Sequence, residues 1–228
     1  MFFIESPVAL VIMLLSFVIA MGAQISVKSA YSKYSKIPTS GRMTGADVAR
    51  DIVRGTNVSV NLHKGGQMSD HFNPRTKSIE LSPEVYGGNS IAALGIAAHE
   101  AGHALQHSHG YAPIKVRNGF LPLAQIGSNM AMPLVIIGMM ASSLTFLIDI
   151  GIIFFIFALI FQIITLPVEF NASARAMSIL RGNSYLTKSE AAGAKAMLRA
   201  AAMTYVAAVV TALLQLLRLL LIARNRRR

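Results

Sequence analysis

An almost uncharged run from Phe120 to Val168 constrains the fold of this chain more than any other feature. Asp149 is the only charged residue in it. A helix needs about 20 mainly apolar residues to cross the hydrocarbon core of a bilayer. The run is long enough for two such helices, and we expect a tight turn between them at residues 142–149. The sequence therefore predicts a transmembrane hairpin.

Two further apolar runs are long enough to cross a membrane. They extend from Pro7 to Val27 and from Tyr205 to Ile222. The second contains Arg218 near its end, where a long side chain can reach the interface. Each run could instead be a buried helix of a soluble protein. However, only 14% of the residues are charged, whereas soluble domains carry about 25%. We therefore expect about four transmembrane helices.

The motif H-E-x-x-H occupies residues 99–103, within a stretch from Ser90 to His107 that is rich in helix-forming residues. In a helix, His99 and His103 lie on one face, so both imidazoles can bind one zinc ion. Glu100 would then stand beside the metal and could take a proton from water. The alternative is a metal-free core helix, but a buried glutamate between two histidines is costly without a cation.

A catalytic zinc site needs three protein ligands and one open position. His109 has the metzincin spacing for the third ligand, but residue 106 is Gln where that motif has a chain-turning glycine. His107 is on the same helix face, about 6 Å further along the axis, which is too far to share the ion. Glu169 follows the predicted hairpin, which would return it to the side of the membrane that carries the zinc helix.

Glu169 is the third ligand that we favour. A carboxylate at the end of a hydrophobic helix needs a partner, and zinc provides one. Glu169 could instead be an interfacial residue in water or paired with Arg175. His109 and other groups stay open as alternatives for the third ligand.

Several sequence blocks resemble the YugP-type family of membrane zinc metallopeptidases, and the resemblance covers nearly the whole chain. The blocks are residues 69–77, 81–86, 97–107 and 166–176. A more distant similarity is to HtpX-like and CAAX-prenyl endopeptidases, which pair H-E-x-x-H with a later E-x-x-x-D. The resemblance implies a gluzincin-like site with His99, His103 and Glu169 as zinc ligands and Glu100 as the catalytic glutamate.

The chain departs from the distant relatives four residues after Glu169, where Ser173 stands in place of their Asp. In those relatives the Asp supports a ligating histidine. Ser173 or Asn171 could do this more weakly, so the support of the zinc ligands stays open.

We expect the fold to be that of a mainly α membrane protein with a small α+β zinc-metallopeptidase domain. An N-terminal transmembrane helix (1–27) and the metallopeptidase region (28–118) precede the transmembrane hairpin (119–168). A loop or helix that completes the zinc site (169–203) and a C-terminal transmembrane helix with a basic tail (204–228) follow.

Helix signals flank the membrane runs. Residues 28–41 are predicted to form a polar linker, because they carry Tyr, Ser, Lys and Pro38. Thr44 and Asp47 resemble a capping box that opens a short helix. Residues 187–190 match the same pattern, and their helix is expected to continue into the last span.

A β-hairpin is predicted before the zinc helix. Residues 57–63 alternate between polar and apolar types, and residues 76–81 are expected to form the second strand. Glycines at 65–66 break the first strand, and residues 73–75 form a turn. A short helical turn is expected at 82–84.

The predicted function is zinc-dependent hydrolysis of peptide bonds, with one zinc ion per chain and Glu100 as general base. The strand at 76–81 could be an edge that binds an extended peptide, or an ordinary hairpin strand. The reaction also needs a donor for the developing oxyanion. The candidates for this donor are His71, Arg75, Tyr86, Tyr111 and Tyr185.

A non-catalytic membrane scaffold or metal transporter is the alternative from another class. Polar residues within the spans could then line a path, namely Gln125, Ser128, Asn129 and Gln162. A site that only binds metal has no need of Glu100, which argues against this alternative.

The net charge of +11 comes from basic residues that flank the apolar runs, as expected for contact with anionic lipid. No nucleic-acid motif is present. The expected partners are the lipid bilayer and a peptide or membrane-protein substrate, and not nucleic acid. Basic segments after the first and third spans predict an active site on the cytoplasmic side of the cell membrane, although the arginine-rich C-terminus opposes this orientation. The sequence does not indicate the oligomeric state.

Overall fold

The computed structural model describes residues 7–226 and divides into two compact units. The helical unit comprises the described residues up to Gln24, Val116–Leu166 and those from Thr204 onward. The α+β unit comprises Ile25–Lys115 and Pro167–Met203. The ends of the predicted segments 1–27 and 204–228 lie outside the described residues.

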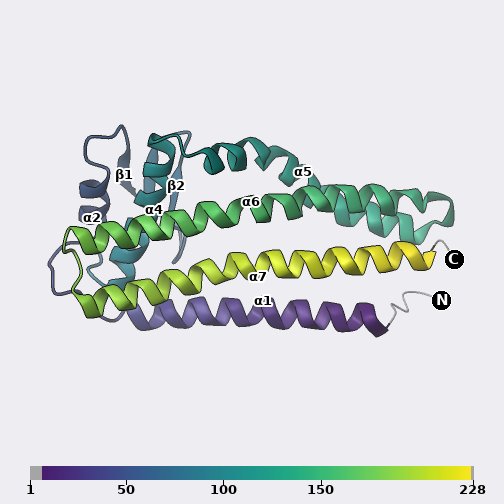
Figure 1. Ribbon diagram of the computed structural model, residues 1–228, viewed down its shortest axis with the longest axis horizontal. Coiled ribbons are helices and arrows are strands. Elements are labelled where there is room, and N and C mark those ends of the chain that lie inside the picture. Colours follow the sequence, from purple (N-terminus) through teal and green to yellow (C-terminus); the bar gives the residue numbers. More distant parts are fainter. Residues whose placement is uncertain (1–6, 227–228) are drawn as a thin grey trace. The chain divides into compact units, whose positions relative to one another are not determined.

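Four long helices dominate the described chain (Figure 1). They are α1 (Pro7–Tyr34), α5 (Ala112–Met140), α6 (Phe146–Gly182) and α7 (Lys188–Arg226). Each is long enough and apolar enough to cross a membrane. Large apolar side chains cover their outer surfaces, as at Val11 and Val18, which are 61% and 64% exposed. Such a surface suits lipid rather than water, so the prediction of four apolar helices of spanning length is confirmed.

Glycines bring the helices of the hairpin into close contact. A Cβ atom at Gly151 of α6 would lie 2.8 Å from the carbonyl oxygen of Ala131 of α5. Small residues at such positions allow membrane helices to pack backbone against backbone. A short 3₁₀ turn at Ser142–Leu144 joins the two helices, where the turn was predicted.

The first helix is longer than the sequence suggests. α1 continues to Tyr34, so the predicted polar linker at 28–41 is wrong in its first half. Tyr31 and Tyr34 pack against a buried cluster that includes Leu94 of α4 (Ile91–Ser108). Tertiary packing of this kind stabilises a helical turn more than its polar composition disfavours it.

Both predicted capping boxes are present. Thr44 accepts a hydrogen bond from the backbone of Asp47, whose carboxylate accepts one from Thr44 N–H, at the start of α2 (Gly45–Ile52). The backbone of Thr187 likewise donates to Glu190. α7 begins there and runs without a break into the last apolar segment, as predicted.

The α+β unit contains a three-stranded sheet in the order β1-β3-β2. β1 (Ser59–Leu62) pairs in parallel with β3 (Ser78–Leu81), and β2 (His71–Asn73) pairs antiparallel with β3. Ile79 and Leu81 of β3 are fully buried in a cluster formed with residues of α2 and α4. The sheet thus packs one face on the helix that carries H-E-x-x-H.

The predicted hairpin of residues 57–63 and 76–81 is wrong. The chain forms β2 between these two strands, and β2 takes the antiparallel place beside β3. Residues 78–81 are therefore the central strand, so of the two alternatives left open for this strand the free edge is wrong. β2 has only three residues, too few to show an alternating pattern in the sequence. After β3, Ser82 leads into α3 (Pro83–Tyr86), the predicted helical turn.

Leu62 and Leu81 offer a matched test of this packing, because they are register partners with different burial. Leu81 is 0% exposed and Leu62 is 50% exposed. We expect Leu81→Ala to lower the free energy of unfolding of the α+β unit by about 2–5 kcal/mol. Leu62→Ala should lower it by less than about 1 kcal/mol. Pulse proteolysis of the detergent-solubilised chain measures both, and equal losses would contradict the packing of β3 in this buried cluster.

Candidate metal centre

The helix α4 carries the two histidines of the motif on one buried face. Ser90 caps its first turn by accepting a hydrogen bond from Ala93 N–H. The rings of His99 and His103 are one turn apart, with centroids 4.7 Å from each other and planes at 84°. His103 is buried, and His99 is partly buried. The spacing of the motif therefore gives the convergence that one metal ion requires.

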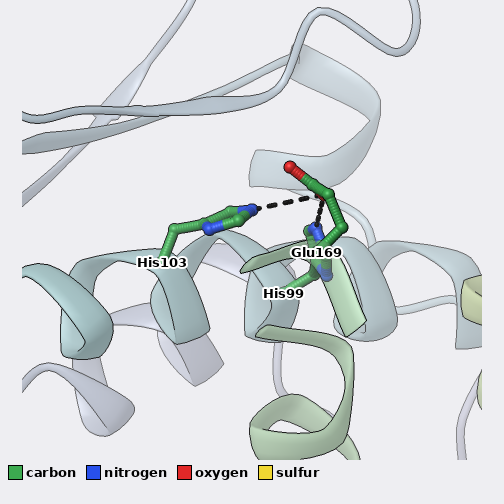
Figure 2. Close-up of side chains that lie close together, drawn as sticks. All are labelled: His99, His103 and Glu169. Carbon is green, nitrogen blue, oxygen red and sulfur yellow. Dashed lines mark ion pairs between the residues drawn. The ribbon is translucent and has the colours of Figure 1, made fainter. Parts of the chain in front are cut away.

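Glu169 of α6 points at both histidines (Figure 2). Its Oε2 lies 3.4 Å from His99 Nε2 and 3.6 Å from His103 Nε2. One ligand atom from each of the three residues lies within 4.8 Å of the others. Among the described residues this is the only such group of three. The structure thus brings together the two motif histidines and the predicted glutamate.

A glycine allows α6 to come this close. A Cβ atom at Gly102 would lie 2.8 Å from the carbonyl oxygen of Ala172 and 3.3 Å from its Cα. Real Cβ atoms do not approach backbone oxygen so closely, so only glycine fits there. Ala172 itself is fully buried. The contact between these two small residues sets the distance from α4 to Glu169.

The donor set fits zinc. Two ligands about 2.1 Å from a tetrahedral zinc ion are about 3.4 Å apart, and two imidazoles with one carboxylate form a known catalytic set. The two separations from Glu169 Oε2 to the histidine Nε2 atoms, 3.4 and 3.6 Å, match that edge length. The local field also favours a cation. Burial opposes protonation of His103, but hydrogen bonding by Glu169 and the charge of Glu100 outweigh it and raise the pKa of His103.

The outer nitrogen of each histidine has its own partner. Ser173 Oγ lies 3.2 Å from His99 Nδ1, and Gln106 Oε1 lies 3.0 Å from His103 Nδ1. Such contacts orient ligating imidazoles and leave Nε2 for the metal. Asn171 contacts neither histidine; its Oδ1 accepts hydrogen bonds from Gln106 and from Arg175.

Glu100 is buried beside the three converging side chains. One of its carboxylate oxygens accepts a hydrogen bond of 2.9 Å from the backbone N–H of Phe72 in β2. Burial raises the pKa of Glu100, and the neighbouring His99 and His103 only partly offset this. A carboxyl group with a raised pKa is suited to accept and release a proton near neutral pH.

The other predicted site residues lie outside the three-residue group. His71 is exposed; its Nδ1 bonds the Ser69 carbonyl, and its ring contacts His63. Arg75 lies in the β2–β3 turn, where its N–H donates to Asn73. Tyr111 lies under the guanidinium of Arg175, 5.9 Å from the ring centroid.

The remaining candidates also have partners of their own. The hydroxyl of Tyr86 contacts Arg50, and that of Tyr185 contacts Asp51. His109 is the exposed C-cap of α4 and is not in the three-residue group. The ring of His107 packs against Phe72.

Two contributors to the site were missed by reasoning from the sequence. The metzincin pattern marks Gln106 only as a departure from its glycine, but a polar residue three positions after a predicted ligand on a buried helix face is a usable signal for a supporting side chain. The backbone N–H of Phe72 carried no signal, because β2 itself was too short to predict.

Two histidines of α4 and a carboxylate of α6 converge in a chain that also has four apolar helices of spanning length, an arrangement that fits the class of membrane metalloproteins. Residues 9–224 match the family described as "Putative neutral zinc metallopeptidase", and the chain belongs to this family. The predicted family resemblance is thereby confirmed. The family implies zinc as the metal.

The chain is also similar to a curated bacterial protein. It is 43% identical over 208 residues to the "Putative membrane protease YugP" of Bacillus subtilis (strain 168). The match covers 90% of this chain and 92% of that protein. With four helices of spanning length, this similarity supports a membrane location. No solved structure matches the chain significantly.

Gly102 and Gly95 provide a matched test of the close helix contact. Gly102→Ala should force α6 away from α4 and lower zinc affinity by at least about tenfold, as disturbed ligand geometry does. A Cβ at Gly95 would meet only the flexible end of Met197, at 3.1 Å, and Ala194. Gly95→Ala should therefore leave zinc affinity unchanged, with a small gain in helix stability. Competition with a chromophoric chelator measures both affinities; equal values would refute the contact's role.

Proposed function

We propose that this protein is an integral-membrane zinc endopeptidase whose zinc ion is held by His99, His103 and Glu169. The observation that carries the proposal is the convergence of these three side chains within 4.8 Å, with Glu100 buried beside them. The proposal includes one zinc ion per chain, because the described residues contain one such group. The family membership supports the metal and the class of reaction.

Glu100 is the proposed general base. A bound zinc ion would polarise the scissile carbonyl and make water a nucleophile near neutral pH. Glu100 would take the proton from the attacking water and pass it to the leaving amine, which requires a carboxyl group that titrates readily near the working pH. Its burial raises its pKa toward that range. The hydrogen bond from Phe72 N–H holds the carboxylate in place through one oxygen.

An extended peptide is the proposed substrate, bound along β2. β2 is an edge strand, and it pairs with β3 on one side only. The N–H of Phe72 points away from β3, toward Glu100. A peptide added to this outer edge as a further strand would lie beside the general base, and it would pair with backbone groups other than the Phe72 N–H, whose hydrogen Glu100 accepts. His71, Arg75 and Tyr111 are proposed as the set that contains the oxyanion donor.

Membrane-associated or misfolded proteins are the proposed substrates, and the cytoplasmic side of the cell membrane is the proposed location of the site. The relative's description as a membrane protease supports the first part. The cytoplasmic orientation rests on the basic segments that follow the first and third spans.

A transporter is less well supported. Its path would need polar side chains turned into the helical unit, yet Gln125, Ser128 and Asn129 are exposed on α5, and only Gln162 of α6 is half-buried among the four candidates. The buried glutamate beside the histidines also has no role in transport.

Glu100→Gln tests the peptidase proposal. The amide cannot accept a proton, so cleavage of casein should fall by about 10²–10⁴-fold, whereas zinc affinity should stay within about threefold of the wild type, because Glu100 is not a ligand. Glu84→Gln is the control, since Glu84 is an exposed residue of α3; it should retain full activity. Cleavage that persists in the Glu100 variant would refute the proposal.

Glu169→Gln and His109→Ala identify the third ligand. Removal of the Glu169 charge should lower zinc affinity by more than the about 10–100-fold that supporting residues contribute. His109→Ala should leave the affinity unchanged, because His109 caps α4 at the surface. The zinc content of each variant after dialysis against a chelator distinguishes the two candidate ligands. The reverse pattern would assign the third ligand to His109.

A further inference from the structure

Gln106 lies between the two helices that carry the proposed zinc ligands. It is fully buried in α4, one turn after His103. Its Oε1 faces His103 Nδ1 at 3.0 Å, and its Nε2 donates to Val168 O at 2.8 Å and to Asn171 Oδ1 at 3.0 Å. Every polar atom of this amide therefore has a partner, as a buried amide requires.

The partners fix which way the amide points. The carbonyl of Val168 can only accept, so it must face the NH₂ group of Gln106. Asn171 presents its oxygen to the same group, because that oxygen also accepts a bond of 2.8 Å from Arg175 Nε. The oxygen of Gln106 is thus left to face His103. If the amide were flipped, its oxygen would face the carbonyl oxygen of Val168, and neither atom could donate a hydrogen.

This orientation determines the form of His103. An amide oxygen accepts, so Nδ1 of His103 carries the hydrogen, and the ring, when neutral and bound to a metal ion, would offer the lone pair of Nε2. That is the nitrogen that faces Glu169 at 3.6 Å. The same amide anchors α6 through the peptide carbonyl that immediately precedes Glu169. A single side chain therefore contacts one proposed ligand, His103 of α4, and the backbone next to the other, Glu169 of α6.

We infer that Gln106 is a positioning residue that acts on two proposed metal ligands at once. It fixes the tautomer of His103, and it fixes the placement of Glu169. The inference rests on the proposed zinc site and deepens it. It also explains why Gln stands where metzincins have glycine. Here α4 continues to Ser108 without turning back, and the third ligand comes from α6, so the chain needs a bridge to α6 at this position rather than a turn.

Two substitutions separate the contributions of the amide. Gln106→Met keeps the length of the side chain and removes all of its hydrogen bonds. Gln106→Glu keeps an acceptor for His103 and removes the donor to Val168. Ser90→Ala is the control, because it removes the cap of the same helix without touching the site; such a loss destabilises the helix modestly.

The experiment uses the full chain in detergent micelles, stripped of metal and titrated with Zn²⁺ against a chromophoric chelator. Gln106→Met should bind zinc about 10–100-fold more weakly than the wild type, as changes in residues that support ligands do. Gln106→Glu should show a smaller but measurable loss. Ser90→Ala should bind zinc as the wild type does. With Co²⁺ in place of zinc, the visible absorption spectrum should change in both Gln106 variants and stay unchanged in Ser90→Ala.

Other results would overturn the inference. Wild-type affinity in Gln106→Met excludes any positioning role, and an equal loss in Ser90→Ala reduces the effect to general destabilisation. Wild-type zinc affinity in Gln106→Glu would refute the proposed role of Gln106 in placing Glu169. These readouts are metal affinity and absorption, so they test the role of Gln106 independently of peptidase activity. A wild type that binds zinc and cleaves no peptide would refute the peptidase proposal alone. A wild type that binds no zinc would refute both.

Discussion

At Gly102 the backbone of α6 approaches α4 so closely that a single Cβ would lie 2.8 Å from the carbonyl oxygen of Ala172. The remaining features of the site depend on this contact. It brings Glu169 within reach of both histidines, places Ser173 beside His99, and puts the Val168 carbonyl within hydrogen-bonding distance of Gln106. Glycine and alanine at the crossing therefore matter as much as the residues that carry the chemistry.

A bound divalent cation would balance the buried charges of the site. Glu100 and Glu169 are both buried, and two buried carboxylates close together are unfavourable without compensation. Two neutral imidazoles do not offset their charge, whereas a divalent ion bound to neutral histidines brings the total to zero. The proposed zinc ion thus accounts for two buried acids that the protein alone would hold at a considerable cost.

The sequence was most informative where one helix contains the whole pattern. The positions of His99, Glu100 and His103 follow from helical spacing, and the long apolar helices follow from the length of their runs. Glu169 required a topological argument, that a hairpin returns the chain to its starting side. The order of the sheet could not be predicted, because β2 has three residues and its pairing depends on β3 and α4. The extension of α1 to Tyr34 depends on contacts with distant segments, which local composition does not encode.

The proposed ligands come from segments that are far apart along the chain, with the whole apolar hairpin between them. A metal ion bound by both helices would therefore act as a cross-link that closes a very long loop. Such a link restricts the unfolded chain, and its binding free energy becomes free energy of folding. The same ion that is proposed to activate water would also hold α6 against α4. Loss of the metal would then both abolish catalysis and destabilise the α+β unit.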